Sequence, residues 1–383
     1  MCMKRVLFIT TISGFLPQFE KNDVKLLKEM GCEIHYASNF ENPIYAFDEE
    51  ELRRQGIILH QIDIAKSPVK FRTNAKAIRQ LKAIIDSYKI DIVHCHNPMG
   101  GVAGRVASGF SRRNPYVIYT AHGFHFYKGA PKVNWALFYP AERLMAHMTD
   151  CIVTINREDY ERACKFRLKK GGSVYQIHSV GVDKKRFDRH PEIAMEKRKE
   201  LSIPQDAFHI VTAAELNANK NQKVIIEAIR KLPEKDIYYS ICGKGSNEKK
   251  LQSLIEEEGL AERVRLLGFR TDMEEILQTA DCFAFPSYRE GLGVAAVEAL
   301  LCGVPLVTAD NRGTREYTID GANAFCCKAD DANFFANAID NLYRNKTLRD
   351  RMSGYARKSA MKFTIEEVEK TMREVYKKAL ERA

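Results

Sequence analysis

The sequence predicts an α/β protein made of two doubly wound, Rossmann-like domains in tandem, and three features lead to this prediction. Short apolar runs rich in β-forming residues alternate with helical patterns, this alternation stops near residue 183, and it begins afresh near residue 209. Such alternation indicates parallel sheets covered by helices. Ligands of these sheets bind beyond the carboxyl ends of the strands, so we expect the two domains to face each other across a cleft and to bind one ligand each.

The first series predicts an N-terminal domain over residues 1–183. Its expected elements are a strand at 5–10, a helix at 22–30, a strand at 33–37, a helix at 76–88, and strands at 90–94, 117–120, 151–155 and 175–177. The polar stretch 184–191 that follows has the composition of a linker.

The second series predicts a C-terminal domain over residues 192–363. Its expected elements are strands at 209–214, 237–242, 264–266 and 282–285, and helices at 222–231, 248–257, 273–279 and 293–301. The final segment, 364–383, has apolar residues at helical spacing: Val368, Met372, Val375 and Leu380. We expect this helix to pack back on the first domain.

Composition narrows the class of protein. The net charge of +10 and the pI near 9.0 favour an anionic ligand or surface, and no nucleic-acid-binding signature accompanies them, so nucleic acid is not expected as a partner. Apolar runs are too short for a membrane-spanning helix, and the start of the chain is interpreted as the first strand rather than a signal peptide. Ten irregularly spaced cysteines without a C-x-x-C pair predict a reduced, cytoplasmic protein.

The tripeptide His94-Cys95-His96 has metal-binding residue types, but it closes an apolar run interpreted as a strand. Successive residues of a strand point to opposite faces, so we interpret these side chains as buried packing residues. No metal site is predicted.

The segment from Pro286 to Ala299 runs from an expected strand through a glycine loop into an expected helix. Glycines let backbone amides at the helix start approach a phosphate, and the helix dipole favours its negative charge. Glu290 precedes this loop and Glu298 lies about two turns into the helix, so one carboxylate can face a sugar and the other a ribose. A glycine-capped helix with two surface acids is the alternative interpretation.

This segment resembles the E-x7-E motif of the family 4 retaining glycosyltransferases of GT-B fold, in spacing and in flanking residues. The resemblance covers most of the chain and includes residues 268–272, 280–281, 298–305 and 313–316. It implies that Glu290 contacts hydroxyls of the donor sugar and that Glu298 contacts the nucleotide ribose. It also implies that backbone amides bind the donor diphosphate at Gly291, Leu292, Gly293 and Val294.

The resemblance implies further donor contacts. Lys220 matches the lysine that grips the diphosphate, whereas Ala214 and Glu215 stand where the family has glycine and arginine, and Arg289 or Lys244 is the candidate to replace the missing charge. Gly243 and Lys244 resemble the family's Gly-x-Gly turn near the donor. Phe269 and Arg270 are expected near the nucleobase, with a plain strand-end turn as the alternative for Phe269. Gly14 occupies the place of the family's first glycine loop, with one glycine only.

A loop in the first domain, residues 120–129, combines histidines, aromatic residues and a lysine, which suits a sugar or lipid-phosphate acceptor. It resembles loops of transferases that extend sugars on polyprenyl diphosphate carriers. By this resemblance His122 contacts the donor sugar and phosphate, and the expected acceptor-binding residues are His122, His125, Tyr127 and Lys128. Phe124 and Phe126 are interpreted as packing on the next helix.

The region from Trp135 to Met145, with Lys128 and Lys132, has the composition of an aromatic and basic rim for an anionic membrane surface. Core packing is an equal interpretation for Trp135 and Leu144.

Together these features predict a retaining glycosyltransferase that moves an N-acetylhexosamine or hexose from a UDP-sugar to a polyprenyl-diphosphate-linked or other glycan acceptor. The expected context is bacterial capsule or exopolysaccharide synthesis, in the cytoplasm and peripherally at the inner face of the membrane. The expected catalytic residues are His122, Lys220 and Glu290, and neither a cofactor nor an essential metal is expected. Two alternatives stay open: a nucleotide-sugar epimerase of the same fold, and a non-catalytic donor-binding subunit, which Ala214 and Glu215 would suit.

Overall fold

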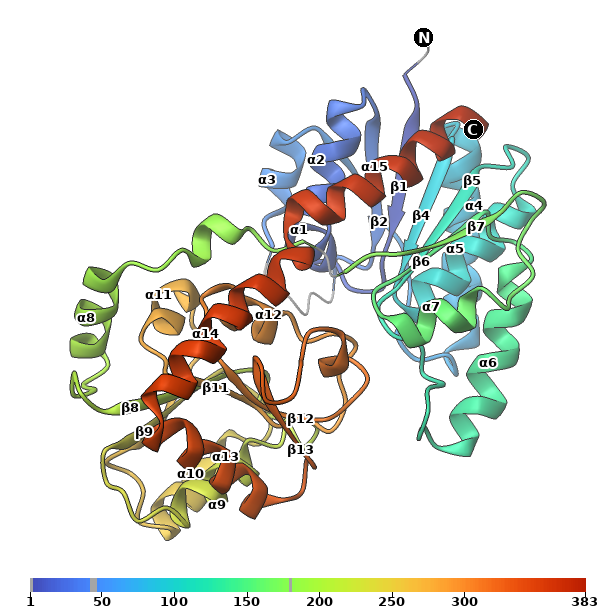
Figure 1. Cartoon of the computed structure of the whole chain (residues 1–383). Coiled ribbons are helices and arrows are strands. Elements are labelled where there is room, and N and C mark those ends of the chain that lie inside the picture. Colours follow the sequence, from blue (N-terminus) through green and yellow to red (C-terminus); the bar gives the residue numbers. More distant parts are fainter. Residues whose placement is uncertain (1–2, 42–46, 179–180) are drawn as a thin grey trace. The chain divides into compact units, whose positions relative to one another are not determined.

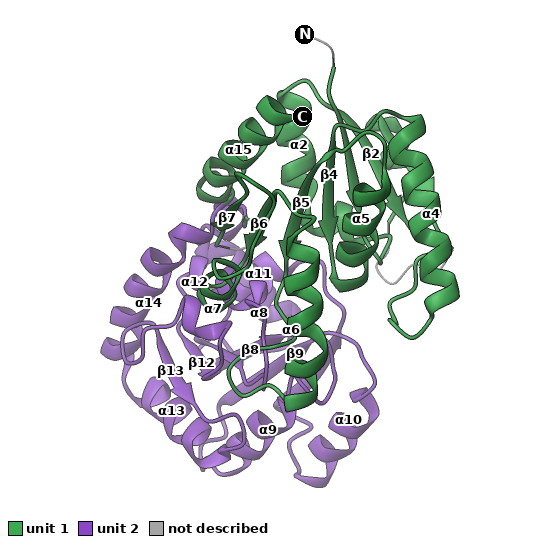
Figure 2. Ribbon diagram, turned by 90° about the vertical axis from the view of Figure 1, so that its right-hand side faces the viewer, with its two compact units in different colours: residues 1–181, 365–383 green, residues 182–364 purple. Residues whose placement is uncertain are grey.

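The computed structural model describes residues 3–41, 47–178 and 181–383, which form two compact units (Figure 2). Unit 1 contains residues 1–181 and 365–383, and unit 2 contains residues 182–364. Each unit is a parallel sheet with helices on its faces (Figure 1). This confirms the predicted α/β class with two doubly wound sheets.

The sheet of unit 1 has seven strands in the order β3-β2-β1-β4-β5-β6-β7. Its strands are β1 (Arg5–Ile9), β2 (Glu33–Ser38), β3 (Ile57–Gln61), β4 (Ile92–His96), β5 (Tyr116–Ala121), β6 (Cys151–Thr154) and β7 (Ser173–Gln176). Its helices are α1 (Phe15–Phe19), α2 (Lys21–Glu29), α3 (Glu49–Arg54), α4 (Phe71–Ser87), α5 (Pro98–Phe110), α6 (Lys132–Ala146), α7 (Arg157–Ala163) and α15 (Ile365–Arg382). The strand order reverses between β1 and β4, where an open parallel sheet forms a crevice for a ligand.

Helix α5 lies so close to the sheet that it needs glycine at two positions. A Cβ atom on Gly101 would lie 2.5 Å from the Tyr119 ring, and one on Gly104 would lie 2.4 Å from the Cys95 Sγ atom. Glycine is a poor helix former, which is why sequence propensity did not predict this helix. Close packing of α5 on β4 and β5 compensates for the low helix propensity of these glycines.

Helix α15 belongs to unit 1 and packs against α2 (Figure 1). Its fully buried Tyr376 donates a 2.7 Å hydrogen bond to Asp23 Oδ2, and the Tyr376 hydroxyl lies 3.0 Å from His94 Nδ1. Val368, Met372 and Val375 are buried, as the helical spacing predicted.

The sheet of unit 2 has six strands in the order β10-β9-β8-β11-β12-β13. They are β8 (Phe208–Ala213), β9 (Ile237–Cys242), β10 (Val264–Gly268), β11 (Cys282–Phe285), β12 (Leu306–Ala309) and β13 (Ala324–Cys327). The helices are α8 (Pro191–Glu200), α9 (Gln222–Arg230), α10 (Glu248–Glu257), α11 (Met273–Gln278), α12 (Val294–Leu301), α13 (Ala332–Arg344) and α14 (Lys346–Ala360). Here the strand order reverses between β8 and β11.

Residues 184–191 lie within unit 2 and are not a free linker between the units. Phe187 is buried, Arg186 pairs with Glu274 at 2.9 Å, and Arg189 Nε donates a 2.6 Å hydrogen bond to the Cys302 carbonyl. The polar composition of this stretch reflects these specific contacts.

Among the described helices, none is both long and apolar enough to cross a bilayer.

Candidate active site

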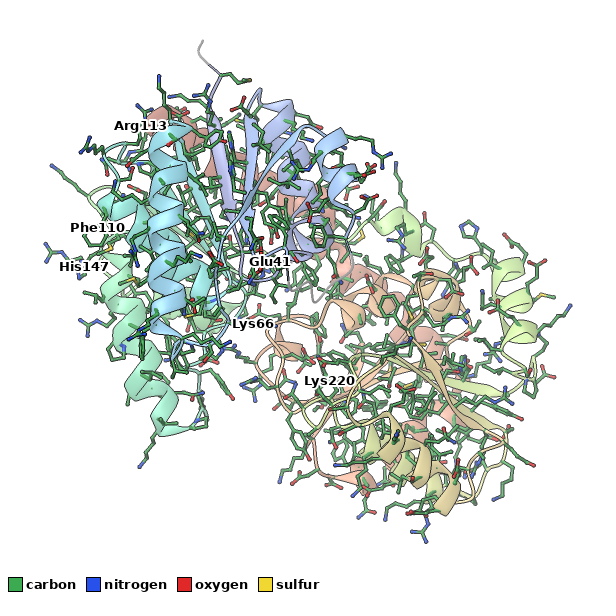
Figure 3. The ribbon with its side chains drawn as sticks, turned by 180° about the vertical axis from the view of Figure 1, so that it is seen from behind. Glu41, Lys66, Phe110, Arg113, His147 and Lys220 are labelled. Atoms are coloured by element: carbon green, nitrogen blue, oxygen red, sulfur yellow. The ribbon has the colours of Figure 1, made fainter. Side chains whose placement is uncertain are left out.

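Lys220 and Glu290 meet at the reversal of strand order in unit 2. Lys220 lies in the loop after β8 and Glu290 in the loop after β11, so these loops leave the carboxyl ends of neighbouring strands. The Lys220 Nζ atom donates a 2.7 Å hydrogen bond to Glu290 Oε1, and Glu290 is buried. Figure 3 labels Lys220 within unit 2. Two residues that the sequence resemblance assigned to donor binding are therefore in direct contact.

Asn219 joins the two loops. Its carbonyl accepts a 2.9 Å hydrogen bond from the Tyr288 amide, and its side-chain Nδ2 donates at 2.9 Å to the Arg289 carbonyl. Because Asn219 precedes Lys220, these bonds fix the position from which the lysine reaches Glu290. The sequence analysis missed this role, since a lone asparagine in a loop carries no specific signal.

The loop after β12 supports Glu290 from another side. Asn311 Nδ2 donates a 3.0 Å hydrogen bond to the Ser287 carbonyl, and its Oδ1 accepts one from the Gly313 amide at 3.0 Å. A Cβ atom on Gly313 would lie 2.8 Å from the Glu290 Cβ atom, so the chain approaches Glu290 as closely as glycine permits. Asn311 was also missed, while the Gly313 segment was part of the family resemblance.

Helix α12 begins next to this pair. Gly293 has φ of 95°, a left-handed conformation that favours glycine, and a Cβ atom there would lie 2.5 Å from the Phe285 ring. The loop Gly291-Leu292-Gly293 thus turns the chain into the helix that starts at Val294. The first amides of a helix have no carbonyl partners within it, so this end is suited to an anion.

Glu298 lies within α12 and is partly buried. Burial raises the pKa of its carboxyl group to about 7, the charge of Arg186 lowers it, and the charge of Glu274 raises it. Hydrogen bonds from hydroxyl groups would stabilise a carboxylate in such surroundings, because they replace the hydrogen bonds to water that burial removes.

The turn Gly243-Lys244-Gly245 after β9 packs directly on the loop after β8. A Cβ atom on Gly243 would lie 1.9 Å from the Ala214 carbonyl oxygen, and the Leu216 amide donates a 2.9 Å hydrogen bond to the Lys244 carbonyl. Both glycines are needed for this approach. The side chains of Lys244 and Arg289 are exposed, and compensation by either for the missing arginine stays a prediction.

Phe269 and Arg270 follow β10. Phe269 is 70% exposed, while Arg270 is bound by Asp272 at 2.6 Å and Glu200 at 2.8 Å. The two carboxylates therefore orient the Arg270 guanidinium group. Contact of these residues with a nucleobase stays a prediction.

In unit 1, Gly14 is the residue before α1 and is buried next to the end of β1. The Thr11 amide of the same loop donates a 3.1 Å hydrogen bond to Asn97 Oδ1, which joins the loops after β1 and β4 at the reversal of strand order. Gly14 thus lies near the reversal of strand order in this sheet, and its contact with a donor stays a prediction.

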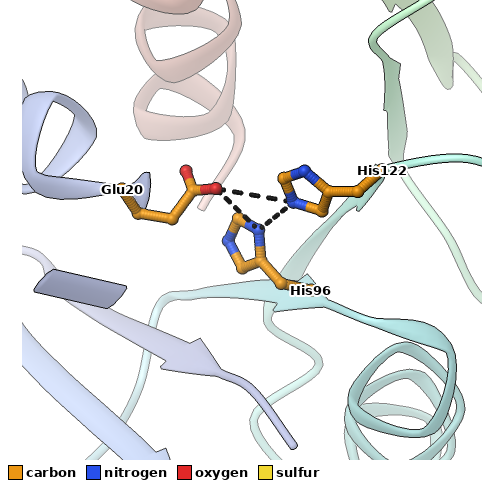
Figure 4. A group of neighbouring side chains, drawn as sticks. All are labelled: Glu20, His96 and His122. Carbon is orange, nitrogen blue, oxygen red and sulfur yellow. Dashed lines mark hydrogen bonds and ion pairs between the residues drawn. The ribbon is translucent and has the colours of Figure 1, made fainter. Parts of the chain in front are cut away.

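His122 follows β5 and lies beside His96 and Glu20 (Figure 4). His122 Nε2 lies 3.2 Å from His96 Nδ1, and Glu20 Oε1 lies 3.4 Å from the His96 nitrogen and 3.5 Å from the His122 nitrogen. His96 is fully buried, in agreement with the sequence interpretation, but its ring nitrogen meets His122. Glu20 was missed, because it is distant in sequence and belongs to no motif.

Burial sets the charge of this group. It lowers the pKa of His122 to about 4 and that of His96 well below its usual value, an effect to which the neighbouring histidines add for His96. Burial, followed by the charge of Asp23, raises the pKa of Glu20 well above its usual value. The imidazole rings are neutral at neutral pH.

The rest of the loop after β5 packs on α6. Phe124 and Phe126 are buried, which confirms their predicted packing role, and the Tyr127 carbonyl accepts a 3.2 Å hydrogen bond from Trp135 Nε1. The His125 ring lies 4.7 Å from the Phe138 ring, and the Lys128 side chain is exposed. Their contact with an acceptor stays a prediction.

The residues of α6 that the sequence predicted as an aromatic and basic rim differ in their burial. Trp135 is partly buried against the core, whereas Leu144 is 60% exposed and does not pack in it. Figure 3 labels Phe110 and His147, which lie at the ends of α5 and α6 on one edge of unit 1.

Comparison with known proteins agrees with both units. Residues 5–156 match the family described as glycosyl transferase 4-like, and residues 194–359 match glycosyl transferases group 1. EpsD of Bacillus subtilis, which is named as a glycosyltransferase, is 39% identical over 97% of this chain and 96% of its own. A galactosyltransferase of Escherichia coli, named for UDP-Gal and α-D-GlcNAc-diphosphoundecaprenol, is 27% identical over 72% of this chain and 73% of its own.

Solved structures agree on the fold. Anabaena HepE in complex with UDP and glucose has a TM-score of 0.78 at 18% identity, over 98% of this chain and all of its own. A glycosyltransferase of Rickettsia africae has a TM-score of 0.80 at 18% identity, over the full length of both chains. With the Lys220–Glu290 pair placed at the start of α12 and a relative of 39% identity along nearly the whole chain, the chain belongs to the family 4 glycosyltransferases of the GT-B fold.

Proposed function

We propose that this chain transfers a sugar from a UDP-sugar, with retention at the anomeric carbon, to a lipid-linked glycan acceptor of bacterial surface polysaccharide synthesis. The observation that carries the proposal is the ion pair of Lys220 with buried Glu290 beside the start of α12. It combines a cation and helix amides for a diphosphate with a carboxylate for sugar hydroxyls. The names of the two relatives, EpsD and the diphosphoundecaprenol galactosyltransferase, support the acceptor class.

Each candidate site residue has a role in the proposed transfer. The diphosphate gains negative charge as the bond to the sugar breaks, and Lys220 with the amides of Gly291 to Val294 stabilises that charge. Glu290 accepts hydrogen bonds from the sugar hydroxyls, and Glu298 accepts them from the ribose. His122, from unit 1, donates to the donor sugar or phosphate, while His125, Tyr127 and Lys128 contribute to acceptor binding.

We propose that this transfer needs no metal at the diphosphate, because Lys220 and the helix amides supply the positive charge there. Turnover measured after removal of metals with a chelator is then expected to equal turnover before it. Strict loss of turnover, restored by a divalent cation, would refute this part.

We further propose that α6 holds unit 1 on an anionic membrane surface. Val133, Leu137 and Leu144 are 66%, 57% and 60% exposed, and their spacing places them along one side of the helix. Lys132 and Arg143 are exposed beside them, as an interfacial helix requires.

Flotation with anionic liposomes at low salt tests the membrane proposal. The parent chain is expected to float and Leu137→Glu to float less, whereas Tyr355→Glu, at an exposed aromatic residue of unit 2, is the matched control and is expected to float like the parent. Failure of the parent to float contradicts the proposal.

A thermal-shift screen of nucleoside diphosphates and their sugars tests the donor. A ligand at 100 times its dissociation constant adds about 2.7 kcal/mol to the free energy of unfolding. We expect UDP and one UDP-sugar to stabilise the parent, and Lys220→Ala and Glu298→Ala to lose this response while folded. Turnover is then followed as release of UDP with a diphosphate-linked acceptor, and donor binding without turnover on any such acceptor counts against the enzyme.

A further inference from the structure

Three side chains of unit 1, Glu20, His96 and His122, direct one potential metal-ligand atom each toward a common point (Figure 4). Among the residues that the structure describes, this is the one group of three histidine, cysteine or carboxylate side chains with this convergence. The atoms Glu20 Oε1, His96 Nδ1 and His122 Nε2 form a triangle with sides of 3.2, 3.4 and 3.5 Å.

These sides match the separation of ligands around zinc. Zinc bonds to imidazole nitrogen and carboxylate oxygen are about 2.0–2.1 Å, and in a tetrahedron this places neighbouring ligand atoms about 3.3 Å apart. Hydrogen bonding explains one side only: the two histidine nitrogens are hydrogen-bonded at 3.2 Å, whereas Glu20 Oε1, at 3.4 and 3.5 Å, lies beyond the usual N–H···O range of about 2.7–3.2 Å. Glu20 Oε1 is buried and makes no hydrogen bond, although Glu20 is only 5% exposed.

The surroundings of the triangle hold its side chains in position. Glu20 precedes α2, and its side chain makes no capping hydrogen bond; it points at the histidines and is also hydrogen-bonded to Asp23. Behind it lie Asp23, Tyr376 and His94, joined by hydrogen bonds of 2.7 and 3.0 Å, which fix α2 and β4 relative to each other. The side chain of His122 is 21% exposed, so an ion has a path to the triangle from that side.

From this geometry we propose that Glu20, His96 and His122 bind one zinc ion through Oε1, Nδ1 and Nε2, with a fourth position open to water or to an oxygen of a ligand. Two imidazoles and one carboxylate with an open position form a known type of zinc coordination. Zinc binding does not rest on the proposed transfer. A bound ion would occupy Nε2 of His122, so the hydrogen bond that the proposed function assigns to His122 would come from its Nδ1 atom.

Metal binding by the stripped chain tests this directly. The full-length protein is freed of metal by chelator, loaded with zinc, passed through gel filtration, and its zinc content is measured by mass spectrometry. The parent is expected to retain one zinc ion per chain more than Glu20→Gln or His96→Asn. Loss of a ligand is expected to weaken binding by more than about 100-fold, because loss of a residue that merely supports a ligand weakens it about 10–100-fold.

A second buried group offers a matched control. His35 Nε2 lies 2.9 Å from Glu33 Oε1 and His35 Nδ1 lies 2.9 Å from His60 Nε2, so the middle ring uses both nitrogens and the three groups share no common point. His60→Asn is therefore expected to retain as much zinc as the parent.

Cobalt gives an independent measurement. Replacement of zinc by Co²⁺ is expected to give the intense visible absorption of a tetrahedral ion in the parent and in His60→Asn, but not in Glu20→Gln. Glu20→Gln keeps the shape of the side chain, and circular dichroism checks that it folds. The proposal is overturned if the parent retains no zinc, or if folded Glu20→Gln binds zinc and cobalt as the parent does.

Discussion

Glu290 lies in the loop before α12 and Glu298 lies within α12, and the two side chains differ in their surroundings. Glu290 is held by a lysine at 2.7 Å, whereas Glu298 is partly buried and has a pKa near 7. The two carboxyl groups are therefore suited to different partners. Glu290 accepts a hydrogen bond from the Lys220 cation, and the carboxyl group of Glu298, with a pKa of about 7, changes charge near neutral pH.

The pH dependence of UDP binding follows from the pKa of Glu298. A raised carboxyl pKa of about 7 means that the group is mostly protonated below pH 7 and mostly ionised above it. Because the ionised form accepts both hydrogen bonds of a ribose diol, affinity for UDP is expected to rise with pH up to about 7 and then to level. Below pH 7 the loss attributable to Glu298 approaches about tenfold per pH unit. Isothermal titration calorimetry measures this profile.

Glu298→Gln is the control for that profile. It cannot ionise, so the contribution of Glu298 disappears and only the titration of the UDP phosphate remains. Equal slopes in the parent and the variant would contradict the assigned role.

Sequence reasoning reached those site residues that a contiguous motif carries. Glu290, Gly293 and Glu298 belong to one strand–loop–helix segment whose spacing matches a family motif, and Lys220 was assigned by the family resemblance alone. Glu20 and His96 meet only because α2 begins beside the end of β4, and Asn311 reaches Ser287 only across two strand ends. Tertiary contacts of this kind leave no local pattern.

At the scale of elements, the loops after β8, β9, β11 and β12 form one connected layer in unit 2. Gly243 touches the Ala214 carbonyl, Asn219 bonds to the Arg289 carbonyl, and Gly313 touches Glu290. A change in one loop is therefore expected to displace the others.

Gly243→Ala tests this connection. The new Cβ atom would lie 1.9 Å from the Ala214 carbonyl oxygen, at φ of 144°, so the loop must move. We expect a loss of more than about 2 kcal/mol in the free energy of unfolding, and loss of the UDP thermal shift. Gly259→Ala is the matched control, because Gly259 has φ of 65° with nothing within 4 Å, and about 1 kcal/mol is expected. Urea unfolding measures both.

Helix α6 is anchored by a buried ion pair. Fully buried Arg105 donates hydrogen bonds to both carboxylate oxygens of Glu142, at 2.8 and 3.2 Å, and lies 4.1 Å from the centre of the Tyr119 ring. This contact fixes one face of α6 on unit 1 and leaves Val133, Leu137 and Leu144 on the exposed face.

Glu142→Ala is expected to destabilise unit 1 by about 3–5 kcal/mol, because it leaves the Arg105 charge buried without a partner. Trp135 is the single tryptophan of the chain and lies in α6, so its fluorescence follows this unfolding. The double variant Arg105→Met/Glu142→Leu removes both charges and is expected to be more stable than Glu142→Ala. If Glu142→Ala unfolds like the parent, the pair does not anchor the helix.

At the scale of the whole molecule, the two units are joined by two passages of the chain, because α15 returns to unit 1 after unit 2 is complete. The sequence indicated two domains and a returning helix from periodicity alone. The units divide after Gly181 and after Thr364, and the contact that places 184–191 in unit 2, between Arg189 and the Cys302 carbonyl, left no signal in the composition.

Tyr376→Phe tests what α15 contributes. It removes the hydroxyl that donates to Asp23 and lies beside His94, and it leaves a buried carboxyl group without this donor. Unit 1 is expected to lose about 1–3 kcal/mol. Unfolding monitored by Trp135 fluorescence is expected to shift to lower urea, while UDP binding at low urea, a property assigned to unit 2, is retained. An unchanged fluorescence transition would mean that the hydroxyl contributes nothing.

The return of α15 also sets an order of events on the ribosome. Residues 182–364 are all synthesised before the helix that carries Tyr376. At about 5–20 residues per second, the nascent first unit waits for tens of seconds with the face of α2 uncovered. During that time unit 2 can fold, whereas unit 1 exposes apolar surface to chaperones and proteases. Chains released from ribosomes that stall within unit 2 are therefore expected to expose this face of α2.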